Sequence, residues 1–280
     1  MTAFDRPEYL ARTLEGYAQL TGLTEYPFYF FLDGPSDAAS AERCQQVRKI
    51  ADAFEHPDKH VHARPKNIGI AHQIYESKKH LFTTYDAVLS CVDDYAVAPY
   101  ALQAVLTAHQ AYEQARPGVK FTMDAFHVNI GSAEEKQPQL DVLRLGYEHA
   151  FYLMTREVWD LIEPDFAEYV RLFIQPYVDA GAPRPYRRRN SGRIRAWFRE
   201  KLGVNVASSF ASSQDGLVRV SMQRQEIRAV TTEVNHTACF GMYGEHQNPG
   251  VFRKRRFDQM HLDLFDADDV LAALAKPRII

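Results

Sequence analysis

The stretch Asp86-Ala-Val-Leu-Ser-Cys-Val-Asp-Asp-Tyr-Ala-Val-Ala-Pro99 decides the predicted fold. The run from Ala87 to Val92 carries no charge and no turn residue, which predicts a central strand buried on both faces. It ends in two adjacent carboxylates, Asp93 and Asp94, at the position where open α/β sheets bind their ligands. Hard cations take oxygen ligands, so the pair is compatible with Mg2+ or Mn2+. The alternative is a turn in which the pair caps the helix that begins near Pro99.

Strand-like and helix-like segments alternate on both sides of this stretch. The alternation predicts an α/β fold in which helices cover both faces of a mostly parallel, doubly wound sheet. We expect residues 1–125 to form a nucleotide-binding half, and residues 126–280 to complete the site and bind a second substrate within the same domain. The predicted helices of the first half are 6–20, 40–54, 67–82 and 99–115, and its predicted strands after the first are 26–32, 60–64, 86–92 and 119–126.

The regular alternation of strand-like and helix-like segments ends after residue 130. Polar residues predict loops at 131–138 and 180–192, and the second of these contains an Arg-rich run. Between these two loops we expect a strand segment at 143–154 and two helices at 155–162 and 166–177. After them we expect a basic amphipathic helix at 194–202, a strand at 229–234, a loop at 235–250 and a final helix at 268–275.

Composition excludes several classes of function. The 280 residues carry a formal net charge of −3, which gives no general attraction to nucleic acid. The three cysteines, Cys44, Cys91 and Cys239, have neither a paired framework nor the spacing of a metal finger. No signal peptide or transmembrane segment is predicted, because the longest apolar runs have the length of strands. We therefore expect a cytoplasmic protein without nucleic-acid partners.

Three features of the first half come where a predicted strand ends: Asp5-Arg6, Asp33-Gly34 and Asp93-Asp94. The carboxyl ends of parallel strands share one edge of a sheet, so we expect these side chains to face one another. Arg6 would pair with a phosphate or with a carboxylate, while Asp5 is the predicted helix cap. Asp33 would bind a base or ribose, or shape its turn. Asn67 is predicted to cap the next helix, with a substrate contact as the alternative.

The second half adds three candidates. Asp215, just before Gly216, is either a general base or a turn residue. His246 lies in a Gly- and His-rich segment and would reach a diphosphate or a metal, or lie on the surface. The arginines of 187–199 form a basic patch that either meets an anionic substrate or is a solvated helix face.

Taken in order, several blocks of the chain resemble the GT-A glycosyltransferases, and among them the N-acetylglucosaminyltransferase I-like enzymes. The blocks are Ala3-Phe-Asp-Arg6, Phe31-Leu-Asp-Gly34, Ile70-Ala-His-Gln-Ile74, Ala87–Pro99, Gln214-Asp-Gly-Leu-Val-Arg219 and Asn235–Phe252. The resemblance implies a GT-A type, Rossmann-like α/β/α domain. It covers most of residues 1–130 and 205–262, and the section 131–205 is expected to hold the acceptor.

The resemblance also implies roles for single residues. Arg6 would bind the donor, Asp33 its uracil, and Gln73 stands nearest to the base-contacting His of the family, with His72 beside it. Asp94 would ligate the metal, with Asp93 near the donor sugar.

The second half supplies two further roles, and one position departs from the pattern of the family. Asp215 would be the catalytic base, and His246 would contact a phosphate or ribose. At Val92 the family has a Glu that contacts the ribose, so this contact is absent here.

The expected function is therefore metal-dependent, inverting transfer of a sugar from a nucleotide sugar, UDP-linked by the resemblance, to a hydroxyl of a saccharide or small-molecule acceptor. Two alternatives stay open. A nucleotidyltransferase would normally have a Gly-rich basic loop after its first strand, and Phe4-Asp-Arg-Pro7 contains no Gly. A non-catalytic nucleotide-sugar-binding protein would bind the donor without releasing UDP.

Overall fold

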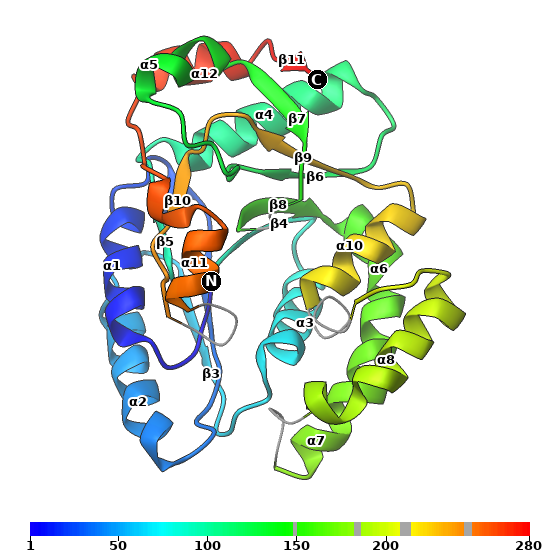
Figure 1. Cartoon of the computed structure of the whole chain (residues 1–280). Coiled ribbons are helices and arrows are strands. Elements are labelled where there is room, and N and C mark those ends of the chain that lie inside the picture. The colour runs from blue at the N-terminus through cyan, green and yellow to red at the C-terminus, as the bar shows by residue number, and fades with distance from the viewer. Residues whose placement is uncertain (148–149, 182–185, 208–213, 244–247) are drawn as a thin grey trace.

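The first three strands form a parallel sheet at one side of the molecule. The computed structural model describes residues 1–147, 150–181, 186–207, 214–243 and 248–280, with side chains omitted for 186–189. The strands β1 (Thr2–Ala3), β2 (Phe28–Leu32) and β3 (Lys59–Ala63) lie in the order β1-β2-β3 (Figure 1). A parallel bridge joins Thr2 to Val92, so β1 lies beside the end of the next strand, β4 (Ala87–Cys91).

A six-stranded sheet continues from β4, in the order β11-β7-β9-β6-β8-β4. Only β7 with β11 and β6 with β9 pair in parallel, whereas β4 with β8, β6 with β8, and β7 with β9 pair antiparallel. The prediction of a mostly parallel sheet is thus wrong here. The sheet is mixed, because β8 lies antiparallel between β4 and β6, and β7 runs antiparallel to β9. The added strands are β6 (Phe121–Asp124), β7 (Val142–Leu145), β8 (Phe151–Thr155), β9 (Arg228–Thr232) and β11 (Arg278–Ile279).

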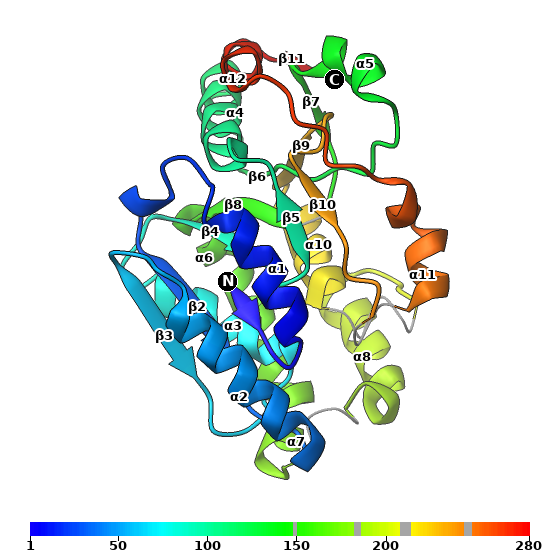
Figure 2. The same cartoon turned by 90° about the vertical axis from the view of Figure 1, so that its left-hand side faces the viewer.

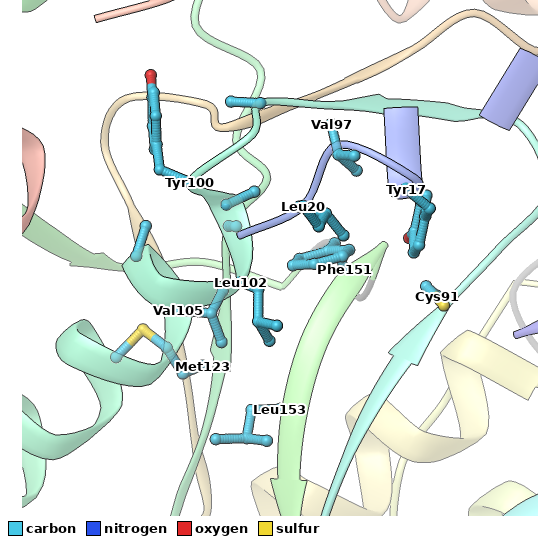
Figure 3. Packing of buried hydrophobic residues seen from close by; sticks show 14 of the residues in the cluster. Tyr17, Leu20, Cys91, Val97, Tyr100, Leu102, Val105, Met123, Phe151 and Leu153 are labelled. Carbon is cyan, nitrogen blue, oxygen red and sulfur yellow. The ribbon is translucent and has the colours of Figure 1, made fainter. Parts of the chain in front are cut away.

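Helices pack against both faces of the six-stranded sheet. Successive residues of β8 point to opposite faces, so Phe151 and Leu153 join one apolar core while Tyr152 and Met154 join another. Figure 3 shows the first core, in which Tyr17 and Phe151 approach edge to face with ring centroids 6.1 Å apart. The chain is therefore a mixed α/β protein with a buried central layer.

Each core has its own helices, whose buried residues recur at helical spacing, such as Leu10, Leu14 and Tyr17. The first core is covered by α1 (Pro7–Tyr17), α2 (Ala38–Ala53), α4 (Ala101–Ala115) and α12 (Ala267–Leu274). The second is covered by α3 (Ile70–Leu81), α6 (Arg156–Tyr169), α7 (Gln175–Asp179), α8 (Tyr186–Leu202) and α10 (Gln214–Arg224). Among the described residues, no helix is long and apolar enough to cross a membrane.

Several predicted boundaries in the second half are wrong. The two helices expected at 155–162 and 166–177 are one helix, α6, which tolerates Pro164 and continues through a π-helical turn at Val170–Ile174 into α7. The loop expected at 180–192 overlaps α8, which includes Gly192. The loop expected at 131–138 contains the short helix α5 (Ala133–Lys136) and a 3-10 turn.

Two short strands lie outside both sheets and were not predicted. β5 (Tyr95–Val97) follows the two carboxylates directly, and it pairs antiparallel with β10 (Thr237–Cys239). Figure 2 shows this pair beside α1. The pairing brings the segment after β10, together with α11 (Pro249–Lys254), to the end of β4.

Candidate functional site

The end of β4 carries a cluster of two carboxylates and one guanidinium. The parallel bridge between Thr2 and Val92 sets the ends of β1 and β4 side by side, so Arg6 reaches Asp93 and Asp94. Arg6 Nη1 donates to Asp94 Oδ2 at 2.8 Å, and Nη2 pairs with Asp93 Oδ1. The structure thus brings together three residues that the sequence placed at one sheet edge.

This cluster of charged side chains is largely withdrawn from water. The side chain of Asp93 is 4% exposed and that of Asp94 is 11% exposed. Burial raises the pKa of Asp93, and Arg6 offsets part of that effect. Burial also disfavours the charged form of Arg6, but the two carboxylates outweigh it and hold the pKa of the guanidinium above its ordinary value. Arg6 is therefore the counter-charge that keeps two adjacent buried acids in place.

The segment after β10 lies directly over Asp94. The Phe240 N–H donates to the Asp94 carbonyl oxygen at 3.1 Å, and Arg6 Nη1 donates to the Tyr243 carbonyl oxygen at 3.3 Å. A Cβ on Gly241 would come within 2.2 Å of Asp94 Oδ2, so only glycine allows this approach. No role was predicted for Gly241, and its place inside the loop predicted at 235–250 was the one signal. His246 lies outside the described residues.

Asp33, which follows β2, is tied to the loop that begins α3. Its Oδ1 accepts from the Gly34 and Ile68 N–H groups, both at 2.9 Å, and its Oδ2 accepts from Asn67 Nδ2 at 2.9 Å and from the Gly69 N–H at 3.0 Å. Burial raises the pKa of Asp33 to about 6, while these backbone donors favour its charged form. A carboxylate has about four acceptor sites, and these four hydrogen bonds occupy them. Asp33 therefore fixes the turn and the loop around it.

The helix caps differ from the predicted ones at two places. Asn67 does not cap α3: the cap residue is Gly69, whose φ of +81° favours glycine, because Asn67 donates to Asp33 instead. Asp5 does not cap α1 but pairs with Arg43 of α2 at 2.6 Å. The cap position of α1 belongs to Arg6, which points toward the carboxylates.

Gln73 and its neighbours present unpaired polar atoms. Gln73 is 2% exposed. Its Oε1 accepts from Arg64 Nε at 2.7 Å, which leaves its Nε2 amide as a donor. Four buried atoms near these loop ends have no hydrogen-bond partner within the described part of the chain: Asn67 Oδ1, His72 Nδ1, Gln73 Nε2 and Asp93 Oδ2. Buried polar groups in proteins are nearly always paired, so these four atoms offer hydrogen-bonding sites to water or to a polar ligand, as do ten other buried atoms elsewhere among the described residues.

Asp215 lies in the first turn of α10 and is exposed. The hydroxyl of Tyr147 donates to its carbonyl oxygen at 2.7 Å. Burial raises the pKa of Tyr152, and the Asp215 carboxylate adds to this rise, so Asp215 is near enough to act on that ring. Tyr152 of β8 is paired with Ser90 of β4, close to where β4 ends. The structure therefore places Asp215 on the second-core side of the strand that leads to Asp93.

α10 is held in place from its other end. Asp165 of α6 accepts from Ser221 Oγ at 2.9 Å and from Arg224 Nη1 at 3.0 Å. Ser221 and Asp165 are buried, so the pair fixes the rotation of the helix that carries Asp215. Asp165 was not predicted to have a role, because it lies between the helices predicted at 155–162 and 166–177 rather than inside one helix.

A metal ion would rely on Asp93 and Asp94. No group of three or more His, Cys, Asp or Glu side chains suited to a metal occurs among the residues that the structure describes. Mg2+ commonly takes only one or two carboxylates together with substrate phosphates, and the unpaired, buried Oδ2 of Asp93 is an acceptor without a donor. The donor set therefore fits a hard cation that arrives with a phosphate-bearing substrate.

Comparison with known proteins gives no information on the function, so the function is inferred from the site. The chain matches no model of a known protein family, and no curated protein sequence matches it.

Proposed function

We propose that this chain is a metal-dependent, inverting glycosyltransferase that uses a nucleotide sugar, with UDP as the favoured nucleotide. The observation that carries the proposal is the end of β4, where Asp93, Asp94 and Arg6 meet beside buried polar atoms that lack partners. The chemistry of such a site suits a charged, polar ligand, and a nucleoside diphosphate supplies both phosphates and hydrogen-bonding groups. The GT-A type of the fold and the resemblance to the N-acetylglucosaminyltransferase I-like enzymes belong to the same proposal.

On the donor side, Asp94 and Asp93 would hold Mn2+ or Mg2+. A bound cation neutralises charge on a leaving diphosphate. Arg6 would turn part of its guanidinium from the carboxylates to the phosphates, since it is 27% exposed and already lies at the rim. The segment 240–243 would close the site over the donor, because its backbone already contacts Asp94 and Arg6.

The base of the donor would lie near the start of α3. The unpaired Nε2 of Gln73 offers a hydrogen-bond donor and the unpaired Oδ1 of Asn67 offers an acceptor. Asp33 would position the loop that carries Asn67, through the four hydrogen bonds that it accepts.

On the acceptor side, Asp215 would take the proton of the attacking hydroxyl. It is exposed on a helix that Asp165 and Tyr147 fix. The hydroxyl oxygen would bond to the anomeric carbon as the bond from that carbon to the diphosphate oxygen breaks. A base on the face opposite the leaving group gives inversion in a single displacement.

The proposal is tested with a panel of nucleotide sugars and Mn2+, by following release of the nucleoside diphosphate with and without acceptors. Asp215→Asn should lower transfer by about 10²–10⁴-fold, as expected for loss of a general base, while UDP binding stays unchanged. Asp160→Asn, an exposed acid of α6, is the matched control and should keep full activity.

The outcomes separate the alternatives. Full turnover by Asp215→Asn removes that residue from the mechanism. Binding of nucleotide sugars without any release favours a non-catalytic binding protein. Release of pyrophosphate from a nucleoside triphosphate and a sugar phosphate favours a nucleotidyltransferase.

A further inference from the structure

A basic hollow lies on α8, away from the end of β4. Its volume is about 480 Å³, and it is lined by Gly192, Arg195, Ala196, Arg199, Asn205 and Val206. The first four recur at spacings of three and four residues, so they share one face of the helix. A Cβ added to Gly192 would meet no atom within 4 Å, which leaves this face open. The opposite face, with Ile194 and Phe198, is buried in the second core.

The charge of this helix is unusual for the chain. α8 contains six arginines and one lysine against one glutamate, whereas the whole chain has a net charge of −3. Lys201 pairs with Glu168, and Arg199 pairs with Glu200 through side chains that are 60% and 70% exposed. Within the described part of the chain, Arg195 has no carboxylate within ion-pair distance. Glu200 therefore offsets the charge of Arg199, and among the described residues the uncompensated charge of the hollow is that of Arg195.

The hollow lies on the face of α8 that points away from the second core, to which α10 also belongs. α8 packs against α10, whose first turn carries Asp215 (Figure 1). Arginine forks bind phosphate oxygens through two parallel hydrogen bonds, and the Asn205 amide adds a further donor on the same wall. Two exposed guanidiniums four residues apart suit one phosphate or diphosphate group.

We propose that this hollow binds a phosphate group of a ligand. The inference does not rest on the proposed function, because the hollow is formed without Asp93 and Asp94. Two kinds of ligand carry such a phosphate group: a soluble phosphate ester and a phospholipid headgroup.

The first experiment is calorimetric titration of pyrophosphate, without divalent cation, into the whole chain and into Arg195→Gln/Arg199→Gln. We expect the double variant to bind at least tenfold more weakly. Arg48→Gln, an exposed arginine of α2, is the matched control and should bind as the wild type does. Equal affinity of all three proteins, or no binding by the wild type to either pyrophosphate or vesicles, would overturn the inference.

The second experiment distinguishes the sources. Vesicles of phosphatidylcholine with phosphatidylglycerol should sediment the wild type but not the double variant if the phosphate belongs to a lipid. Pyrophosphate binding without sedimentation indicates a soluble ester. Tighter binding to duplex RNA than to either probe would overturn the inference.

Binding of UDP with Mn2+, measured on the same proteins, should be equal in the double variant and the wild type. If the wild type binds pyrophosphate at the hollow but never UDP with Mn2+, the proposed function fails and phosphate binding by the hollow stands.

Discussion

Replacement of Arg6 by Met tests whether its guanidinium offsets the two carboxylates at the end of β4. The Arg6 side chain is 27% exposed, against 4% for Asp93 and 11% for Asp94. Removing one partner of a buried ion pair costs about 3–5 kcal/mol. Since part of the guanidinium contacts water, we expect a loss of about 2–3 kcal/mol in the free energy of unfolding.

The loss should depend on pH in a definite direction. Without Arg6, burial raises the pKa of Asp93 further above its unfolded value, so stability is lost as pH rises through the raised value. The difference from the wild type should therefore be largest near neutral pH and shrink as pH falls toward the ordinary Asp pKa of about 4. Arg6→Met/Asp94→Asn should be more stable than Arg6→Met alone, because one buried charge is removed.

The assay is thermal and urea unfolding of the purified chain, where about 1 kcal/mol moves the Tm of a chain this long by about 2–4 °C. Arg12→Met is the matched control, since Arg12 lies on the same helix, is exposed, and contacts the Phe240 ring at 4.3 Å. It should lose about 1 kcal/mol or less. Equal losses in the two variants, or a loss for Arg6→Met that does not change with pH, would refute the reasoning.

Two further predictions concern the segment around β10. Gly241→Ala should weaken binding of UDP with Mn2+ at least tenfold in calorimetry, because the new Cβ would displace Asp94 Oδ2 or lift the segment. The control is Gly192→Ala, where a Cβ meets no atom within 4 Å and φ is not positive, and unchanged binding by Gly241→Ala would contradict the contact. Burial lowers the pKa of His236 to about 4, so the folded state resists a proton that the unfolded chain takes up below about 6.5, and stability falls between these values by about 3 kcal/mol. His236→Leu should remove that part of the acid sensitivity in unfolding curves, and an unchanged pH slope would count against the buried neutral ring.

The sequence predicted the parts of this fold that have a local cause. The apolar runs at β2 and β4 and the helical spacing of Leu10, Leu14 and Tyr17 carry their own signals. The prediction of a central strand buried on both faces is nevertheless wrong for β4, which is the last strand of the six-stranded sheet and only partly buried. The antiparallel insertion of β8 between β4 and β6 has no such signal, because its partners are distant in the sequence. The helix through Gly192 was missed because glycine lowers local helix propensity, whereas the burial of Ile194 and Phe198 stabilises α8 from outside.

The candidate site divides in the same way. Arg6, Asp93 and Asp94 were predicted to meet because the ends of parallel strands share one edge, and they do meet. The contact of Gly241 with Asp94 depends on the pairing of β5 with β10, which joins residues over 130 positions apart. The four bonds to Asp33 likewise depend on how the loop before α3 closes, and no spacing in the sequence reveals that closure.

The most direct measurement is a calorimetric titration of UDP into the wild type and into Asp94→Ala, each with and without Mn2+. We predict that the wild type binds UDP tightly only when Mn2+ is present and that Asp94→Ala loses this dependence together with most of its affinity. Equal binding by the two proteins, or tight binding by the wild type that ignores Mn2+, would contradict a cation held between Asp94 and a diphosphate.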